Sequence, residues 1–153
     1  MNKVVLLTEE GLKKLHDELK VLKEDRRKEV IERIQEAVAH GDLSENADYA
    51  QAKEEQSFLE GRIMEIEEMI KNAQIIAPSK NQGIVNVGST VSLKVNDKEV
   101  KYTIVGANEA NPASGKISNE SLVGRSLLGA KKGDKVTVTT PVGPTEYEIV
   151  KIE

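Results

Sequence analysis

Two segments of the chain repeat apolar residues at alternating steps of three and four, the spacing of helices that pack along a common seam. Only a short, largely polar stretch, residues 40–49, separates them. Because so short a connection makes neighbouring helices run back along each other, we predict an antiparallel coiled coil with residues 40–49 at its tip. The seam positions are Leu12, Leu15, Leu19, Leu22, Arg26, Val30, Ile34 and Ala37 in the first segment and Leu59, Ile63, Ile66, Ile70 and Ala73 in the second.

Folding the two segments together gives a register in which the numbers of facing residues sum to about 85. Leucines then face isoleucines near the base, while alanine-sized residues face each other near the tip, so we expect a firmly held base and a loosely held tip. Three successive steps of four, starting at Leu22, break the heptad, and such a stutter locally unwinds a supercoil. The predicted facing pairs are Leu12 with Ala73, Leu15 with Ile70, Leu19 with Ile66, Leu22 with Ile63, and Ala37 or Val38 with Ala47.

Beyond residue 83 the apolar period changes from that of a helix to the alternation of a strand. We therefore predict an α+β chain made of an N-terminal antiparallel two-helix coiled coil over residues 1–76, a linker over residues 77–83, and a small antiparallel β-sheet domain with one short helix over residues 84–153. Thr8 is the predicted N-cap of the first helix. The other predicted elements are strands at 89–95, 99–105, around Ile117, 135–140 and 146–152, a hairpin turn at Asn96-Asp97, and a helix over 121–128 that stops at Gly129.

The charge of the chain is divided unevenly between its halves. The whole chain carries −4 at pH 7, with residues 1–76 at −6 (12 Lys and Arg against 18 Asp and Glu) and residues 77–153 at +2 (10 against 8). An acidic chain with a pI near 5.4 is a poor candidate for a protein whose main task is to grip duplex nucleic acid. The chain has no cysteine, no leader-like N-terminus and no apolar run near 18 residues, so we expect a cytoplasmic protein with no membrane partner.

Three acids, Asp42, Glu45 and Asp48, stand at intervals of three in the predicted tip. One interpretation is structural: Asp42 caps the second helix and Glu45 reaches back to close a capping box. The other is chemical, because clustered carboxylates suit Mg²⁺, which takes one or two of them and completes its shell with water or phosphate oxygens. Two carboxylates do not bind Mg²⁺ tightly on their own, so the second interpretation requires ligands from a partner. Spacing leaves both open.

Other residues near the tip have a structural and a functional interpretation as well. His40 could ligate a metal, but a histidine in the last turn of a helix more often interacts with the helix carbonyls. Tyr49 could stack on a base or support the tip together with Asp48. Arg26, Arg27 and Arg33 form a basic cluster that could contact RNA phosphates, although the surrounding acids also fit a solvated charged face.

Several motifs together resemble the bacterial Gre transcript-cleavage factors, which are transcription elongation factors. They are the tip sequence His40-Gly41-Asp42-Leu43-Ser44-Glu45-Asn46-Ala47-Asp48-Tyr49, the segments Glu60-Gly61-Arg62-Ile63 and Asn72-Ala73-Gln74, and the later matches Gly88-Ser89-Thr90-Val91 and Arg125-Ser126-Leu127-Leu128-Gly129. The resemblance covers essentially the whole chain, and the acidic balance is closer to the GreA branch than to the more basic GreB branch.

The resemblance implies that the coiled coil enters the secondary channel of bacterial RNA polymerase while an FKBP-like second domain docks at the channel rim. It also implies that Asp42 and Glu45 supply carboxylates to a Mg²⁺ ion shared with the polymerase, which then cleaves the 3′ end of backtracked nascent RNA. On this view the protein is not itself an enzyme, binds no metal stably alone and acts as a monomer.

Two alternatives belong to other classes. A channel-occupying transcription inhibitor without cleavage activity is the first, and the unmodified tip motif favours cleavage over it. A prolyl isomerase is the second, but residues 77–153 contain only Tyr102 and Tyr147 as aromatics, too few for the required pocket.

Overall fold

The computed structural model describes residues 3–42, 45–77 and 83–153, which fold into two compact units. One unit is Leu12–Asn72, and the other combines Met1–Gly11 with Ala73–Glu153. The fold class is α+β, as predicted from the sequence. The boundaries differ from the sequence division at residue 76, because the first residues of the chain pair with the segment that follows the second long helix. Most of the predicted linker lies outside the described residues.

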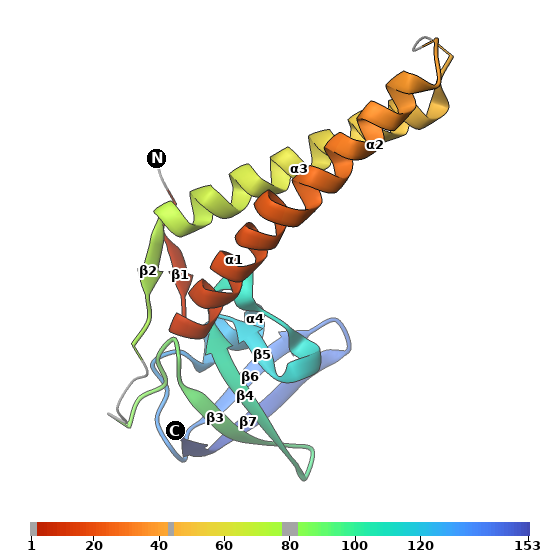
Figure 1. Ribbon diagram of the computed structural model, residues 1–153. Helices are drawn as coiled ribbons and strands as arrows, with labels where there is room; N and C mark the ends of the chain where they lie inside the picture. The colour runs from red at the N-terminus through yellow and green to blue at the C-terminus, as the bar shows by residue number, and fades with distance from the viewer. Residues whose placement is uncertain (1–2, 43–44, 78–82) are drawn as a thin grey trace. The chain divides into compact units, whose positions relative to one another are not determined.

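The helical unit is an antiparallel hairpin, in which the ribbon runs out along one helix and back along the other (Figure 1). Within the described residues, five ion pairs join its two arms, and the numbers of their partners sum to between 80 and 90, which confirms the predicted register. The outgoing arm consists of α1 (Glu9–Val21), the π-helical segment η1 (Leu22–Arg26) and α2 (Arg27–Ala39), and the returning arm is α3 (Ala47–Lys71).

The π-helical segment η1 lies where the sequence breaks the heptad. A π-turn accommodates more residues than an α-turn, so steps of four from Leu22 onward stay on the side that faces α3. The interruption in the apolar pattern is therefore absorbed by a local change in helix geometry, and Val30 beyond it is buried with 1% exposure.

Burial along the hairpin does not test the expectation of a firmly held base and a loosely held tip, which stays a prediction. The four leucines of α1 and η1 are partly buried, and Leu19 and Leu22 pack against the buried cluster of Val30, Leu59 and Ile63. Ile66, which the predicted register places opposite Leu19, is buried with 0% exposure. Ala37 and Ala52, nearer the tip, are also buried, at 3% and 4% exposure. Alanine side chains are small, so their burial removes little apolar surface from water.

The start of the chain forms a strand that the sequence analysis did not predict. β1 (Val5–Leu7) pairs in parallel with β2 (Ala73–Ile75), which follows directly after α3. Thr8 then caps α1 as predicted, since its hydroxyl oxygen accepts a hydrogen bond of 3.0 Å from the amide of Gly11. A three-residue parallel pair carries no periodic signal of its own, which is why spacing alone missed it.

The second unit contains a five-stranded sheet in the order β5-β4-β3-β7-β6 (Figure 1). All neighbours are antiparallel except β4 and β5, which are parallel, so the sheet is mixed and the all-antiparallel prediction is corrected at that edge. The strands are β3 (Thr90–Val95), β4 (Lys98–Val105), β5 (Lys116–Ser118), β6 (Lys135–Thr140) and β7 (Gly143–Ile152).

The turns of this unit follow the predicted chemistry. Asn96 and Asp97 join β3 to β4 with φ of 49° and 62°, the left-handed conformations that a tight hairpin requires. The short helix α4 (Leu122–Leu127) starts after Ser121, whose hydroxyl oxygen accepts from the Gly124 amide at 3.0 Å, and it ends before Gly129 with φ of 82°. Two short 3₁₀ turns, η2 (Ala107–Glu109) and η3 (Pro112–Ser114), fill the loop between β4 and β5.

The core of the second unit lies between the sheet and α4. Its buried members come from strands β3, β4 and β7, from α4 and from the segment before the sheet: Val85, Val91, Leu93, Ile104, Leu127, Ile149 and Ile152. Among the described residues, no helix is both long enough and apolar enough to cross a membrane.

Candidate functional site

The tip of the hairpin connects the end of α2 to the start of α3. α2 ends at Ala39 with His40 as its C-cap, and Gly41 follows with φ of 116°, a value that glycine adopts without strain. α3 begins at Ala47. Asp42 and Glu45 therefore both lie in the connection, while the two residues between them, 43 and 44, lie outside the described residues.

The capping-box interpretation of Asp42 and Glu45 is wrong. The N-cap of α3 is Asn46, four residues later than Asp42, with extended backbone angles and a side-chain oxygen that accepts from the Tyr49 amide at 3.0 Å. Asparagine is as good an N-cap as aspartate, so sequence spacing did not separate the two positions. The structure thereby assigns the helix-capping role to a neutral residue.

The three acids of the tip line one shallow hollow. Asp42, Glu45 and Asp48 share a space of about 310 Å³ with His40, Asn46 and Ala47, and all three acids are exposed. Asp48 lies in the first turn of α3, where its negative charge is favourable near the positive end of the helix dipole. The structure thus brings together the acids that the sequence selected, at the free end of the hairpin.

The donor set of the tip consists of carboxylates, which are hard oxygen ligands. Among the described residues, no group of three or more histidines and acids is placed to hold a metal ion. Two exposed carboxylates are nevertheless the ligands that Mg²⁺ takes when substrate oxygens or water complete its shell. The chemistry of these side chains is compatible with Mg²⁺, and Mg²⁺ binding at the tip stays a prediction.

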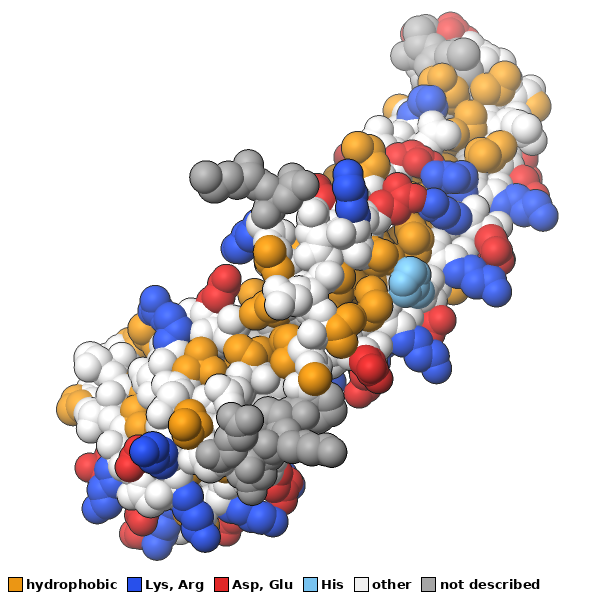
Figure 2. Space-filling view, turned by 90° about the vertical axis from the view of Figure 1, so that its left-hand side faces the viewer, with side chains coloured by type: hydrophobic (Ala, Val, Ile, Leu, Met, Phe, Trp, Pro, Cys, Tyr) orange, Lys and Arg blue, Asp and Glu red, His pale blue; other side chains and the backbone are white. Residues whose placement is uncertain are grey.

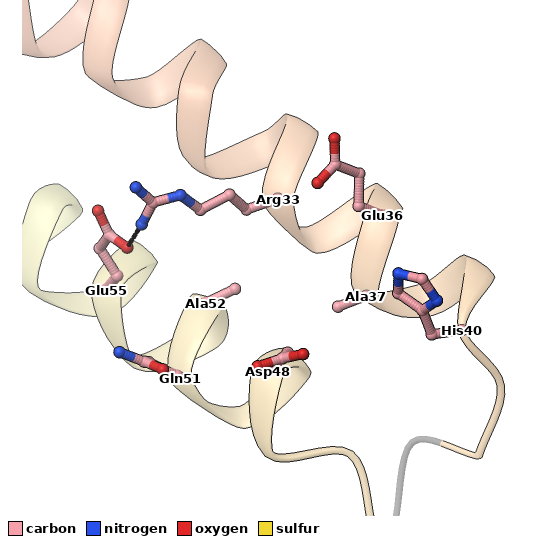
Figure 3. Close-up of a pocket in the computed structure, with 8 residues that line it drawn as sticks. All are labelled: Arg33, Glu36, Ala37, His40, Asp48, Gln51, Ala52 and Glu55. Atoms are coloured by element: carbon pink, nitrogen blue, oxygen red, sulfur yellow. Dashed lines mark hydrogen bonds and ion pairs between the residues drawn. The ribbon is translucent and has the colours of Figure 1, made fainter.

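A second hollow, of about 280 Å³, lies between α2 and α3 just behind the tip. Figure 3 shows the methyl groups of Ala37 and Ala52 facing each other across it, with His40 on one side and Asp48 on the other. Arg33 and Glu55, joined by an ion pair of 2.5 Å, lie at the end farther from the tip. The short side chains of Ala37 and Ala52 leave this space between the arms unfilled.

The arginines considered for RNA contact are paired with glutamates. Arg27 makes two hydrogen bonds to Glu60, of 2.8 and 2.9 Å, and this interaction raises the pKa of its guanidinium. Arg26 and Arg33 both bind Glu55, which places them in the network that joins the two arms. Figure 2 shows basic and acidic side chains interspersed along the face of the hairpin that is in view. RNA contact by these arginines stays a prediction, and it would have to compete with these ion pairs.

Comparison with known proteins decides the family. Residues 5–75 match the family model described as the N-terminal domain of transcription elongation factors, and residues 80–153 match the GreA/GreB C-terminal domain. The chain belongs to the GreA/GreB family of transcription elongation factors. Relatives of this GreA/GreB factor share its full length: the transcription elongation factor GreA of Alkaliphilus oremlandii is 55% identical over 97% of this chain and 95% of its own. The transcription elongation factor GreA of Acetivibrio thermocellus is 49% identical over 99% of this chain and 97% of its own.

Solved structures of the same family also align with this GreA/GreB factor. The GreA factor homolog 1 (Gfh1) of Thermus thermophilus is 29% identical, with 99% of both chains covered and a TM-score of 0.45. A GreA/GreB factor of Nitrosomonas europaea is 19% identical, with 98% of both chains covered and a TM-score of 0.43.

Proposed function

We propose that this protein binds bacterial RNA polymerase, enters its secondary channel with the helical hairpin, and stimulates the polymerase's own cleavage of backtracked RNA. Family membership supports a role in transcription elongation. Cleavage would remove the displaced 3′ end of the nascent RNA and create a new 3′ end at the active site, so that an arrested complex resumes synthesis. The protein acts as an accessory factor, and the polymerase provides the catalytic centre.

The observation that carries this proposal is the division of roles at the tip. The N-cap of α3 is Asn46, a neutral residue, and not one of the two acids. Both carboxylates are exposed in the connection at the end of the hairpin. Clustered like charges on a helix connection bring a cost in repulsion, and a cation supplied by a partner would offset it.

The two carboxylates of the tip would act as metal ligands within the polymerase active site. A second Mg²⁺, when bound there, supplies the activation of water and the charge stabilisation that phosphodiester cleavage needs. Asp42 and Glu45 would hold that ion and accept hydrogen bonds that orient the attacking water. Asp48 and Tyr49 support the tip from the first turn of α3.

The rest of the chain serves to deliver the tip. The ion pairs between the arms, such as the two hydrogen bonds from Arg62 to Glu18 of 2.8 and 3.2 Å, keep the hairpin closed along its length. Residues 77–153, with their positive balance, would dock on the polymerase as a monomer.

The test is RNA shortening in a stalled, backtracked elongation complex. The parent protein should shorten the RNA, and Asp42→Asn and Glu45→Gln should each lose most of this stimulation while still competing with the parent for polymerase. Raised Mg²⁺ should restore part of the activity. Glu54→Gln is the matched control, because it removes an exposed acid of α3 outside the tip hollow.

Two results would contradict the proposal. Full cleavage by the double variant Asp42→Asn/Glu45→Gln would exclude a metal-binding role for these acids. Slower elongation without any RNA shortening by the parent would instead identify a channel-occupying inhibitor.

A further inference from the structure

The side chain of Asn46 connects the two arms of the hairpin at the tip. Its oxygen accepts from the Tyr49 amide at 3.0 Å, which caps α3, and its amide nitrogen donates to the Ala37 carbonyl at 2.7 Å, in the last turn of α2. One planar group therefore joins the last turn of one helix to the first turn of the other. The side chain is partly buried, so water competes only in part for these bonds.

The partners of Asn46 require an amide in this orientation. A backbone amide such as that of Tyr49 only donates, and a backbone carbonyl such as that of Ala37 only accepts, so the side-chain oxygen and nitrogen cannot be exchanged. An aspartate would cap the helix equally well but would turn a second acceptor toward the Ala37 carbonyl. A serine would cap the helix with its single oxygen. Its side chain has no second polar atom to reach α2.

The position of Asn46 in the chain gives this bridge a consequence for the acids. Glu45 is the adjacent residue, so fixing Asn46 against α2 also fixes the backbone from which the Glu45 carboxylate extends. Misplacement of a reacting group by about 1 Å can cost on the order of 100-fold in rate. A carboxylate delivered at the end of a long hairpin depends on its anchoring for that accuracy.

We propose that Asn46 is a positioning residue, whose amide bridge from α2 to α3 holds the Glu45 carboxylate in register for the cleavage reaction. The proposal rests on the proposed function, because it concerns how accurately the tip acids are presented. It separates two roles of one side chain: the cap stabilises α3, and the bridge sets the place of Glu45.

Three substitutions at Asn46 distinguish these roles. Asn46→Asp and Asn46→Ser keep the cap and lose the bridge, and the serine variant does so without adding a charge beside the tip acids. Asn46→Ala loses both. RNA shortening would be measured over a range of factor concentrations, so that the maximal cleavage rate and the half-saturating concentration are obtained separately.

The bridge predicts that all three variants lose maximal rate, by about 10- to 100-fold, with an unchanged half-saturating concentration. Parent-like maximal rates for the Asp and Ser variants, with only the Ala variant slow, would reduce Asn46 to a cap and overturn the proposal. A higher half-saturating concentration with an unchanged maximal rate would also overturn the proposal, since it would show that Asn46 affects docking and not the cleavage step.

Nuclear magnetic resonance of the free protein provides a readout that does not need polymerase. The side-chain amide protons of Asn46 should exchange slowly in the parent, and the Glu45 backbone should become more mobile on the nanosecond timescale in Asn46→Ser. If the parent stimulates RNA cleavage but the mobility of the Glu45 backbone is unchanged in Asn46→Ser, the bridge is overturned and the proposed function stands. If the Glu45 backbone becomes more mobile in Asn46→Ser but the parent does not stimulate RNA cleavage, the proposed function is overturned and the bridge stands.

Discussion

The carboxylate of Glu109 accepts two hydrogen bonds from Thr8, 101 residues earlier in the chain: one from its amide at 2.7 Å and one from its hydroxyl at 2.6 Å. The same hydroxyl caps α1 by accepting from the Gly11 amide. The start of the first helix is therefore held by a residue from the loop between β4 and β5. This contact explains why the first residues of the chain belong to the same unit as the sheet.

Removing the Glu109 carboxylate should destabilise the protein. Glu109→Ala leaves the Thr8 amide and hydroxyl without their acceptor, and we expect the free energy of unfolding to fall by about 1–3 kcal/mol. Glu109→Gln retains one acceptor oxygen, so its free energy of unfolding should fall by less. Urea unfolding followed by circular dichroism measures both. Equal stability of the parent and Glu109→Ala would show that Thr8 caps α1 without help from the loop.

Two glycine substitutions should act in opposite directions. A Cβ at Gly11 would lie 2.1 Å from the Glu109 carboxylate oxygen, so Gly11→Ala must displace the carboxylate and should destabilise the protein. A Cβ at Gly61, in the interior of α3, meets no atom within 4 Å, so Gly61→Ala should stabilise it by about 1 kcal/mol. In a Glu109→Ala background, Gly11→Ala should become stabilising as well. Unfolding free energies of the four variants test this, and a destabilising Gly61→Ala would contradict it.

The distribution of burial along the hairpin predicts an order of stability losses. Ile63 is 2% exposed, so Ile63→Ala should cost about 2–5 kcal/mol. Leu19 is only partly buried, so Leu19→Ala should lower the free energy of unfolding by less. Val38 is 48% exposed, so Val38→Ala should change it by no more than about 0.5 kcal/mol. Thermal and urea unfolding of the three alanine variants would reveal this order. A greater loss of stability for Leu19→Ala than for Ile63→Ala would contradict this order.

Glu153 should contribute to stability in a pH-dependent way. Its carboxylate accepts from Lys151 at 2.8 Å and forms an ion pair with Lys101 at 3.1 Å, and these lysines hold its pKa below the ordinary value of 4.5. Because the pKa is lower in the folded state, the stabilisation is present above pH 4.5 and is lost as the pH falls through the folded-state pKa. Glu153→Gln should flatten the decline of stability below pH 4.5. The matched control, Glu99→Gln on β4, removes an exposed carboxylate without touching these ion pairs, and an identical decline in parent and Glu153→Gln would contradict the assignment.

Apolar and turn patterns determined the long helices, the strands of the five-stranded sheet and the pairing of the helices. The three-four spacing gave the hairpin and its register, alternation gave the strands, and Asn96-Asp97 gave the turn between the first two. These features follow from local periodicity and backbone preference, which neighbouring residues in the sequence suffice to define. The same spacing selected Asp42, Glu45 and Asp48 as one group, because residues in one short connection stay together in any fold that places it at a tip.

Tertiary structure alone decided where the chain divides and which tip residue caps α3. The pairing of β1 with β2, the parallel contact of β5 with β4 and the bond from Glu109 to Thr8 join segments that no local pattern relates. Whether Asp42 or Asn46 caps α3 depends on where the returning helix begins against α2, since either residue type satisfies the backbone. The hydrogen bond from Asn46 to Ala37 fixes that start, and an interaction between two helices has no signature in the spacing of either one.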